Sequence, residues 1–552
     1  MAATVLAAIG AGVAVAVYAY VSGLQKNIAK ARKTGLVYLG YSTGQTHFDR
    51  LGTETFLVAT PGSLTMHTQS AETFPKDVAT YGVLELFGKN VLTTEGALWS
   101  IHRKVTSASF NEKNAAYTFT EAINQTKGLL NMWFGPDGET RGTTRTIRSL
   151  EHDTITWALN IIGYVGFGLR LLWPGQELPK DLDPRLAKYG SLDPPPGHTM
   201  TFVDSVALTL ERIMAIMVFP EVLLRVLPFR FAKEAYKAKI NYVRYMDDAP
   251  RDGMDIIGQL VQSKYGENAG KDGSSNTTFK LDDSDIIGNA FIMTVAGHET
   301  IANTLYFGLL ELANNPAAQR RLQHDIDSIF GTTDPSTWDY ETNISPLLAS
   351  HVSAYVNETL RLVPPVTGIP KVTTPDVEHA ITINGRTYVF PAGTSCYLVA
   401  VCAYRNPRWW PTRPSKRTGK QTDLDDYLPE SIEEEDEIVD IAEYSGFQGS
   451  DVSASLYRPV RGSYLPFSDG ARSCLGRRIA MVEMAAALAA IFQRYSVELA
   501  VDEWASDREE KSQETIGQAE TVLTLKLQGG RHVPVRFVTR GKERFVSDPE
   551  LL

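Results

Sequence analysis

The feature that most constrains the fold is a lone cysteine held between two glycines near the C-terminus. The segment Phe467–Gly476 reads F-S-D-G-A-R-S-C-L-G, and a helix-like run follows it. Gly470 and Gly476 allow the backbone to turn and to approach a bound group closely. Backbone N–H groups at the start of the next helix favour a lowered pKa for the Cys474 thiol. The segment therefore predicts a loop that presents one thiolate, and a buried structural cysteine is the alternative interpretation.

The composition of the whole chain describes an ordinary folded protein. Of its 552 residues, 43% are hydrophobic and 21% are charged, so a large core can form. The formal net charge of −10 argues against a nucleic-acid partner. Only three cysteines occur, at positions 396, 402 and 474. A disulfide framework is therefore not expected, and one thiol is available for a special task in a reducing compartment.

The N-terminus differs in kind from the rest of the chain. Met1 to Gln25 carries no charge, and Ala2–Gly23 is dominated by apolar residues. As a helix, this stretch would span about 33 Å, which is enough to cross a bilayer core. Basic residues follow at once, namely Lys26, Lys30, Arg32 and Lys33. We expect a transmembrane signal anchor at 1–25 and a basic linker at 26–54, with the body of the protein facing the cytoplasm. A cleaved secretory signal is the alternative.

The rest of the chain reads as mainly helical with small sheets. Apolar residues at three- and four-residue spacing indicate helices within 110–135, 145–170 and 201–245. The longest helical pattern has Ser284 as a plausible N-cap and stops before Pro316. Alternation on both sides of Asn384-Gly385 predicts a β-hairpin, and Thr55–Thr60 resembles a strand. We therefore expect one large mainly-α domain over 55–552.

The middle of the long helix contains Ala296-Gly297-His298-Glu299-Thr300. A glycine inside an apolar helix costs about 1 kcal/mol relative to alanine, so its presence invites a reason. If this helix crosses a site where oxygen is activated, Gly297 leaves room there, and the acid–alcohol pair Glu299 and Thr300 can deliver protons. The alternative is a threonine that bonds back to a helix carbonyl, next to a surface glutamate.

A second pair of charges lies further along the chain. Glu358 and Arg361 stand three residues apart, which places them on one face of a helix. On a surface such a pair is common and contributes little. Buried, it would lock the local structure, because neither charge tolerates isolation.

The order of these motifs resembles the cytochrome P450 family, and it looks most similar to microsomal fungal members. A-G-x-E-T is followed by E-x-x-R, an Asn-Gly hairpin and F-x-x-G-x-R-x-C-x-G, and upstream a W-x-x-x-R pattern begins at Trp99. The resemblance implies the cytochrome P450 fold and a haem b cofactor with an axial thiolate from Cys474. It also implies further haem-binding residues, which are Trp99, Arg103, Ala296, Phe467 and Arg472.

The resemblance also implies the remaining roles and the activity. Glu299 and Thr300 would be the catalytic proton relay, and Glu358, Arg361, Gly470 and Gly476 would be structural. The protein would be a membrane-anchored monooxygenase of the endoplasmic reticulum that oxidises a lipophilic small molecule with O2, within secondary metabolism. Because no dinucleotide fingerprint follows a strand, electrons would come from NADPH-cytochrome P450 reductase. Arg472, Arg477 and Arg478 would contribute to a basic docking face.

Two alternatives stay open, and the sequence departs from the family pattern in places. The alternatives are a reductase-independent haem-thiolate isomerase or dehydratase, and a haem-binding protein without turnover. Ser431 stands where the family usually has an arginine that joins Glu358 and Arg361, and Arg417 is a candidate substitute. Lys371 stands where a propionate-binding arginine is common. The region between the anchor and Trp99 is short, which puts the N-terminal sheet in doubt.

Overall fold

The computed structural model describes the greater part of the chain, in two compact units. The described residues are 55–58, 73–136, 138, 140–177, 184–248, 281–383, 386–429, 459, 462–500, 508–521, 524–527 and 531–544. The sheet unit comprises Met1–Tyr81, Thr367–Pro411 and Pro459–Ser473. The helical unit comprises Gly82–Val366, Thr412–Arg458 and Cys474–Leu552. The expected anchor and linker at 1–54 lie outside the described residues.

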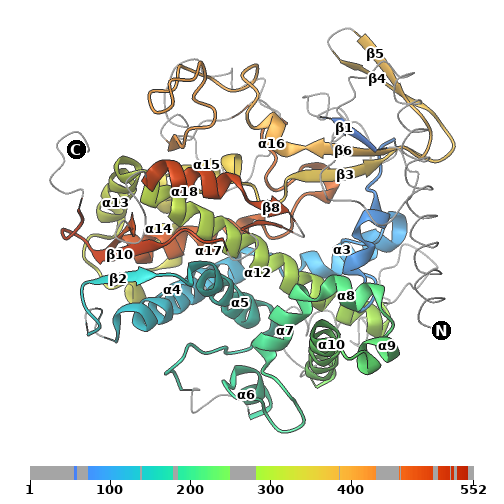
Figure 1. Cartoon of the computed structure of the whole chain (residues 1–552), viewed down its shortest axis with the longest axis horizontal. Helices are drawn as coiled ribbons and strands as arrows, with labels where there is room; N and C mark the ends of the chain where they lie inside the picture. The colour runs from blue at the N-terminus through green and yellow to red at the C-terminus, as the bar shows by residue number, and fades with distance from the viewer. Residues whose placement is uncertain are drawn as a thin grey trace, which may run out of the picture. The chain divides into compact units, whose positions relative to one another are not determined.

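The sheet unit is built on a three-stranded sheet in the order β1-β6-β3, with strands Thr55–Val58, Ser395–Val399 and Gly368–Val372. β1 is parallel to β6, and β3 is antiparallel to β6. A hairpin of β4 (His379–Ile383) and β5 (Arg386–Phe390) forms a second sheet, as the Asn-Gly signal predicts. α16 (Ala400–Ala403) and the 3₁₀ helix η4 (Gly470–Arg472) complete the unit (Figure 1). The N-terminal sheet that the short leading region put in doubt is therefore present.

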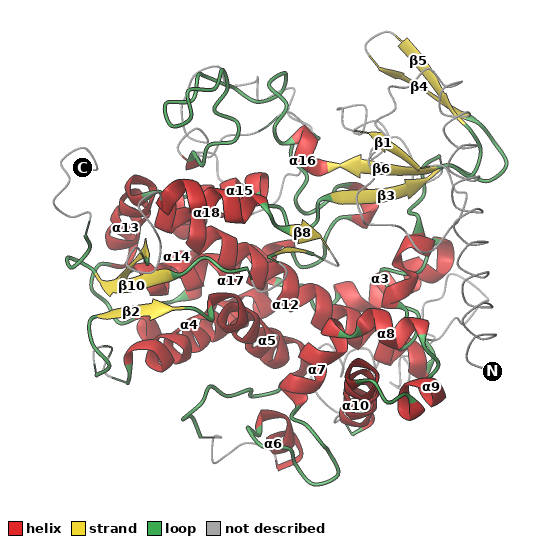
Figure 2. Ribbon diagram, viewed as in Figure 1, coloured by secondary structure: helices red, strands yellow, loops and turns green. Residues whose placement is uncertain are grey.

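The helical unit contains most of the helices, and Figure 2 shows them in red. The first group is α3 (Gly96–Ser107), α4 (Glu112–Phe134), α5 (Leu150–Phe167), α6 (Pro184–Gly190), α7 (Phe202–Glu211), α8 (Ile213–Val218), α9 (Glu221–Val226) and α10 (Arg230–Asp247). The second group is α12 (Asp283–Asn314), α13 (Pro316–Phe330), α14 (Tyr340–Leu348), α15 (His351–Leu362), α17 (Arg477–Phe492) and α18 (Arg508–Gly517). Short 3₁₀ helices are η1 (Val78–Leu84), which begins in the sheet unit, and η2 (Pro335–Thr337).

Two small antiparallel sheets belong to the helical unit. The first has the order β2-β10-β7, with strands Thr144–Ile147, Val535–Thr539 and Tyr495–Leu499. The second is the hairpin of β8 (Glu520–Thr521) and β9 (Leu525–Lys526). The first sheet joins segments that are far apart in the sequence, so it ties the C-terminal strand β10 to β2, which precedes α5.

The core of the helical unit forms around α12 and α17. α12 is 32 residues long and nearly all of it is buried, because it packs against α5 on one side and also contacts α15 and α17. α17 is apolar on every face, and a helix of that kind belongs in an interior. Its alanine-rich stretch Ala485–Ala490 allows close packing against α4.

The local patterns predicted these helices well, with small differences at their ends. The 110–135 and 145–170 patterns correspond to α4 and α5, although the second begins with the short strand β2. The 201–245 pattern is divided into α7 to α10. α12 starts slightly earlier than expected: Asp282, not Ser284, is the N-cap, and the Asp285 carboxylate accepts a hydrogen bond from the Asp282 N–H at 3.1 Å. None of the helices within the described residues combines the length and the apolar character that a bilayer span requires.

Candidate active site

Cys474 lies immediately before α17, and the start of that helix points N–H groups at its sulfur. The backbone N–H groups of Gly476 and Arg477 donate to the thiol, and the charges of Arg103 and Arg477 favour its ionised form. Burial by surrounding protein atoms outweighs these effects and raises the pKa of the Cys474 thiol. The sequence argument was therefore right about the effect of the helix start but wrong about the net direction. A thiol in this setting ionises when a metal cation binds it.

The two glycines that flank the cysteine serve different purposes. Gly470 has a φ of +70°, so it occupies the left-handed region that the turn into η4 requires. Gly476 has a φ of −84°, which any residue adopts. A Cβ at Gly476 would lie 3.5 Å from Phe110 and 3.9 Å from the Cys474 sulfur, which are ordinary contacts. A side chain there would occupy space beside the sulfur without a clash.

Cys474 and two residues of α12 have side chains that are accessible to a bound group. The side chain of Cys474 is accessible to solvent although protein atoms surround its sulfur, which is the combination expected on the wall of a concave space. On α12, Ala296 is exposed and Thr300 is half-exposed, while most of that helix is buried. These features fit the expected haem. It needs one axial ligand, for which the Cys474 thiol is available, and an unobstructed opposite face, for which a small exposed residue such as Ala296 is suited.

Trp99 and Arg103 lie one turn apart on α3, so both side chains leave the same face of the helix. Arg103 is half-buried and close enough to Cys474 for the two charges to interact. Burial lowers the pKa of Arg103, and Cys474 opposes that shift. The structure therefore brings Arg103 close to Cys474.

The A-G-x-E-T residues point in different directions from α12. The Thr300 hydroxyl donates to the Ala296 carbonyl at 2.8 Å, in the exposed part of the helix. A Cβ on Gly297 would lie 2.9 Å from Ile162 of α5, so this glycine permits close helix packing, and our expectation that it leaves room for oxygen is not needed to explain it. Glu299 is buried and accepts a hydrogen bond from Lys526 of β9 at 3.3 Å. His298 is buried and pairs with the Thr294 carbonyl at 2.6 Å, and burial lowers its pKa.

Glu358 and Arg361 form a buried, two-pronged ion pair on α15. Arg361 donates through Nε and Nη2 to the two oxygens of Glu358, at 2.7 and 2.8 Å. Arg361 also donates to the carbonyls of Leu424 and Asp426, at 2.8 and 3.2 Å. The N–H of Leu428 donates to Glu358 at 2.9 Å. Backbone groups of 424–428 therefore satisfy both charges.

Neither of the two residues considered as a third partner of the Glu358–Arg361 pair is seen to join it. Arg417, considered as a substitute for the missing arginine, instead pairs with the Asp426 carboxylate at 3.4 Å. Ser431 lies outside the described residues. The role that a third side chain was expected to play is taken, in the part of the chain that the structure describes, by the main chain of 424–428.

The remaining predicted haem contacts belong to the sheet unit. Phe467 and Arg472 are half-buried in and beside η4, and the charge of Arg472 acts on Tyr81. Lys371 is buried in β3, where its register partner is Cys396 on β6. Arg472 is two residues before Cys474 in the chain, so the peptide itself keeps the two close.

Sequence reasoning missed partners that come from distant parts of the chain. Asn289 of α12 donates to Nδ1 of the buried His102 at 2.8 Å and accepts from the Val91 N–H at 3.0 Å. Lys526 was not singled out either, although it reaches Glu299. No local spacing signals such pairs, because the residues are separated by about two hundred positions in the chain.

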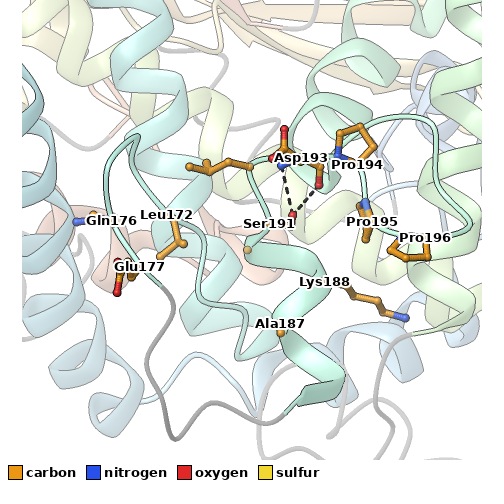
Figure 3. Close-up of a pocket in the computed structure, with 12 residues that line it drawn as sticks. Leu172, Gln176, Glu177, Ala187, Lys188, Ser191, Asp193, Pro194, Pro195 and Pro196 are labelled. Atoms are coloured by element: carbon orange, nitrogen blue, oxygen red, sulfur yellow. Dashed lines mark hydrogen bonds between the residues drawn. The ribbon is translucent and has the colours of Figure 1, made fainter.

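A pocket elsewhere in the helical unit carries none of the predicted residues. Figure 3 shows it between the segment after α5 and the loop that follows α6, where Ser191 Oγ donates to the Asp193 carbonyl at 2.6 Å. Three consecutive prolines, Pro194–Pro196, form one wall. Glu177, Lys188 and Asp193 also line it, but none of the residues that the motifs predict does, so this pocket is not the candidate active site.

Comparisons with known proteins agree with the motifs. The sequence model described as Cytochrome P450 matches residues 50–416 and 457–525. Cytochrome P450 monooxygenase 124 of Postia placenta is 27% identical over 489 residues, covering 85% of this chain and 81% of that protein. The phomenoic acid biosynthesis cluster cytochrome P450 monooxygenase of Leptosphaeria maculans is 24% identical over 469 residues, with 81% and 72% covered. Cytochrome P450 3A1 of Rattus norvegicus is 25% identical over 423 residues, with 75% and 71% covered.

A solved structure shares the fold. The crystal structure of a cytochrome P450 (CYP102L1) matches with a TM-score of 0.60 at 17% identity, covering 88% of this chain and 92% of that chain. The expected fold class, mainly helical with small sheets, is confirmed. Members of the matched family bind haem through a cysteine thiolate, and the haem expected from the motifs is the cofactor of the family. The chain therefore belongs to the cytochrome P450 family and is a monooxygenase of that family.

Proposed function

We propose that the chain is a membrane-anchored haem-thiolate monooxygenase that oxidises a lipophilic small molecule with O2. Its electrons come from NADPH-cytochrome P450 reductase, and its catalytic domain spans 55–552. The relative from the phomenoic acid biosynthesis cluster supports a place in fungal secondary metabolism. The exposed Val366, after α15, supports a lipophilic substrate.

One observation carries the proposal: Cys474 sits at the start of α17 with two N–H groups and Arg103 around its sulfur. In this role Cys474 is the metal ligand. Arg103, Trp99 and Arg472 would hold the haem propionates, and Ala296 and Phe467 would contribute to binding the haem. When bound, a haem with a thiolate ligand supplies the electron-rich iron that activates oxygen. The residues of this chain orient that group, exclude water and move protons.

The proton relay in this proposal uses Thr300 and Glu299. Thr300 is half-exposed beside Ala296, so its hydroxyl can hold a proton at the open part of α12. Glu299, the preceding residue, is an acid with a buried side chain, and in this proposal it supplies protons to the relay. The pair supports a monooxygenase over an isomerase, because an isomerase has no need for delivered protons.

The docking of a reductase relies on the arginines around the ligand loop. Arg478 is engaged by Glu112 of α4 at 2.6 Å and by the Tyr340 hydroxyl at 3.1 Å. It therefore fastens α17 to its neighbours and contributes less to a docking face than the sequence indicates. Arg477 remains the proposed docking residue, because Arg472 is assigned to a haem propionate in this proposal.

We also propose that the chain is held at the endoplasmic reticulum membrane by residues 1–25, with the catalytic domain in the cytoplasm. The uncharged apolar sequence and the basic residues after it support a single pass. A second support is a set of exposed apolar side chains between α8 and the first turn of α10. They are Met214, Val218, Val222, Leu223, Val226, Phe229 and Phe231. Exposed apolar surface of this kind suits contact with the bilayer interface.

The experiment that tests the proposed function replaces Cys474 by serine in the full-length protein. The wild type should show the absorption of a thiolate-ligated haem when reduced and bound to carbon monoxide, and it should consume NADPH with the reductase. C474S should lose both properties. C402S is the matched control, because Cys402 is an exposed cysteine on α16. A C474S protein that keeps the signature and the NADPH consumption would refute the proposal.

A further inference from the structure

The acid of the proposed relay is part of a buried ion pair that its motif does not reveal. Lys526 Nζ, on β9, donates to Oε1 of Glu299, on α12, at 3.3 Å. Only 7% of the Glu299 side chain is exposed, against 29% for Lys526. A carboxylate this deep needs a compensating charge, and the ammonium group of Lys526 provides it.

The hairpin that carries Lys526 is fastened on both sides. Thr524 accepts a hydrogen bond from Asn303, one turn further along the same face of α12, at 2.8 Å. The Leu525 N–H donates to the Pro365 carbonyl, after α15, at 2.9 Å. Because these bonds restrain the two residues just before the lysine, the position of its ammonium group at Glu299 does not depend on the flexible side chain alone.

The two oxygens of Glu299 are in different situations. Oε1 is occupied by Lys526, while Oε2 is buried and has no hydrogen-bond partner among the described residues. A buried carboxylate oxygen requires a donor, so this atom is the place for a water molecule or a transferred proton.

The other titratable groups nearby do not replace the lysine. Burial lowers the pKa of His298, which keeps its ring neutral. Glu151, in the first turn of α5, is a second acid whose pKa is raised by burial, and the charge of Lys526 opposes that shift. Lys526 therefore stands between two carboxyl groups, and it makes its direct contact with Glu299.

We propose that Lys526 is a positioning residue for the relay: it holds Oε1 of Glu299 in place, which leaves Oε2 to take up a proton and pass it on toward Thr300. This inference rests on the proposed function, in which Glu299 and Thr300 deliver protons. It adds that the hairpin β8–β9, remote in sequence from both residues, sets the position of the Glu299 carboxylate.

A thermal double-mutant cycle on the haem-loaded, full-length protein tests the pair without measuring activity. The variants are K526M, E299Q and the double variant, with K526R as the conservative change. K526M should lower the unfolding temperature by several degrees, because it leaves a buried carboxylate uncompensated. The double variant should recover at least half of that loss, and K526R should stay near the wild type. The control cycle uses Lys420 and Asp425, an exposed pair with side chains 60% and 51% accessible, and should be additive. An additive Lys526–Glu299 cycle would overturn the inference.

A second measurement distinguishes positioning from a purely structural role. NADPH consumption with the reductase, without added substrate, is compared in H2O and D2O. K526M should slow it about tenfold and raise the solvent isotope effect, in line with a weakened acid–base step. The double variant should be no slower than E299Q, and K526R should restore the rate. An unchanged isotope effect in K526M would leave Lys526 a structural residue and refute the positioning role.

The two proposals fail in distinguishable ways. If the wild type lacks the thiolate signature and does not consume NADPH with the reductase, the proposed function is wrong, and so is the role of Lys526 in a relay. If the signature and the NADPH consumption are normal while the thermal cycle is additive, the function stands and the inference about Lys526 is wrong.

Discussion

The three cysteines have the same side chain and entirely different surroundings. Cys396 is buried in β6, and burial raises the pKa of its thiol to about 12. Cys402 is exposed on α16, where partial burial raises the pKa of its thiol and the charge of Arg405 opposes that shift. Cys474 has amide N–H groups and two arginines around its sulfur. The surroundings of each sulfur therefore distinguish a buried core cysteine (Cys396), a surface thiol (Cys402) and a candidate metal ligand (Cys474).

At the residue scale, the first prediction concerns Thr300. Removal of its hydroxyl in T300A should leave the reduced carbon monoxide spectrum unchanged, because Thr300 does not touch the ligand loop in this proposal. It should divert reducing equivalents into hydrogen peroxide, because protons are no longer delivered in step with electrons. The measurement is the hydrogen peroxide released per NADPH consumed.

Thr304 is the matched control for that change. It lies one turn further along α12, and its hydroxyl donates to the Thr300 carbonyl at 2.8 Å. T304A removes the same kind of helix back-bond, so its peroxide yield should equal that of the wild type. A T300A protein with wild-type coupling would contradict the relay.

At the element scale, α15 depends on Glu358. In E358A the buried Arg361 loses its counter-charge, and the expected cost is about 3–5 kcal/mol of stability. Little haem-loaded protein should then be recovered, and haem per polypeptide is the measurement. R417A is the control, because Arg417 is partly exposed and its ion pair with Asp426 should contribute at most about 1 kcal/mol. Normal haem content in E358A would remove the structural role.

A second element-scale prediction concerns the crossing of α12 with the segment before α3. A Cβ on Gly288 would lie 2.5 Å from the Gly88 carbonyl oxygen, which is backbone and cannot rotate away. G288A should therefore lose about 1–3 kcal/mol through overpacking, although alanine is the better helix former by about 1 kcal/mol. Gly517, with nothing within 4 Å of its Cβ position, is the control for thermal unfolding. A G288A protein more stable than G517A would contradict the predicted clash, because it would show that the crossing has room for a methyl group.

These elements also show how far the sequence could lead. α12, α15 and the β4–β5 hairpin were predictable, because periodicity, caps and an Asn-Gly turn are local signals. The Glu358–Arg361 pair was predictable for the same reason. The partners Lys526 for Glu299 and Asn289 for His102 were not, since they lie 227 and 187 positions away. Only packing brings such residues together, and no spacing rule in one sequence reports it.

At the scale of the whole molecule, two buried histidines should make stability depend on pH. Burial lowers the pKa of His102 and of His298 from 6.5. At His102, Asp285 and the hydrogen bond from Asn289 oppose the shift, while Lys89 adds to it. Below about pH 6.5 these two histidines bind protons in the unfolded chain but stay neutral in the folded protein. The free energy of unfolding should therefore fall as the pH falls.

The measurement is the unfolding temperature between neutral pH and about pH 5, a range in which free histidine gains its proton. H102Q keeps an acceptor for Asn289 but removes one titrating group, so its stability should fall less steeply than that of the wild type. Equal slopes for the two proteins would contradict the assignment to His102.

The membrane proposal also belongs to this scale. Deletion of residues 1–25 should move the protein from the membrane pellet toward the supernatant, because the longest uncharged segment is lost. The reduced carbon monoxide spectrum should not change, since the catalytic domain is intact. A variant with V13R and V17R should behave like the deletion, as charges at the centre of a span oppose insertion. Unchanged pelleting in both variants would exclude the anchor.

The backbone contacts of 424–428 with α15 have a consequence for how this protein tolerates change. A carbonyl or an amide is present whatever amino acid occupies the position, so substitutions in this loop leave the grip on Glu358 and Arg361 in place. Proline at 428 is the exception, because it removes the one donor involved. Because backbone groups make these contacts, the residue types at 424–428 do not reveal them. The contacts would be lost through a change in the backbone conformation of this loop, and most changes of side chain would preserve them.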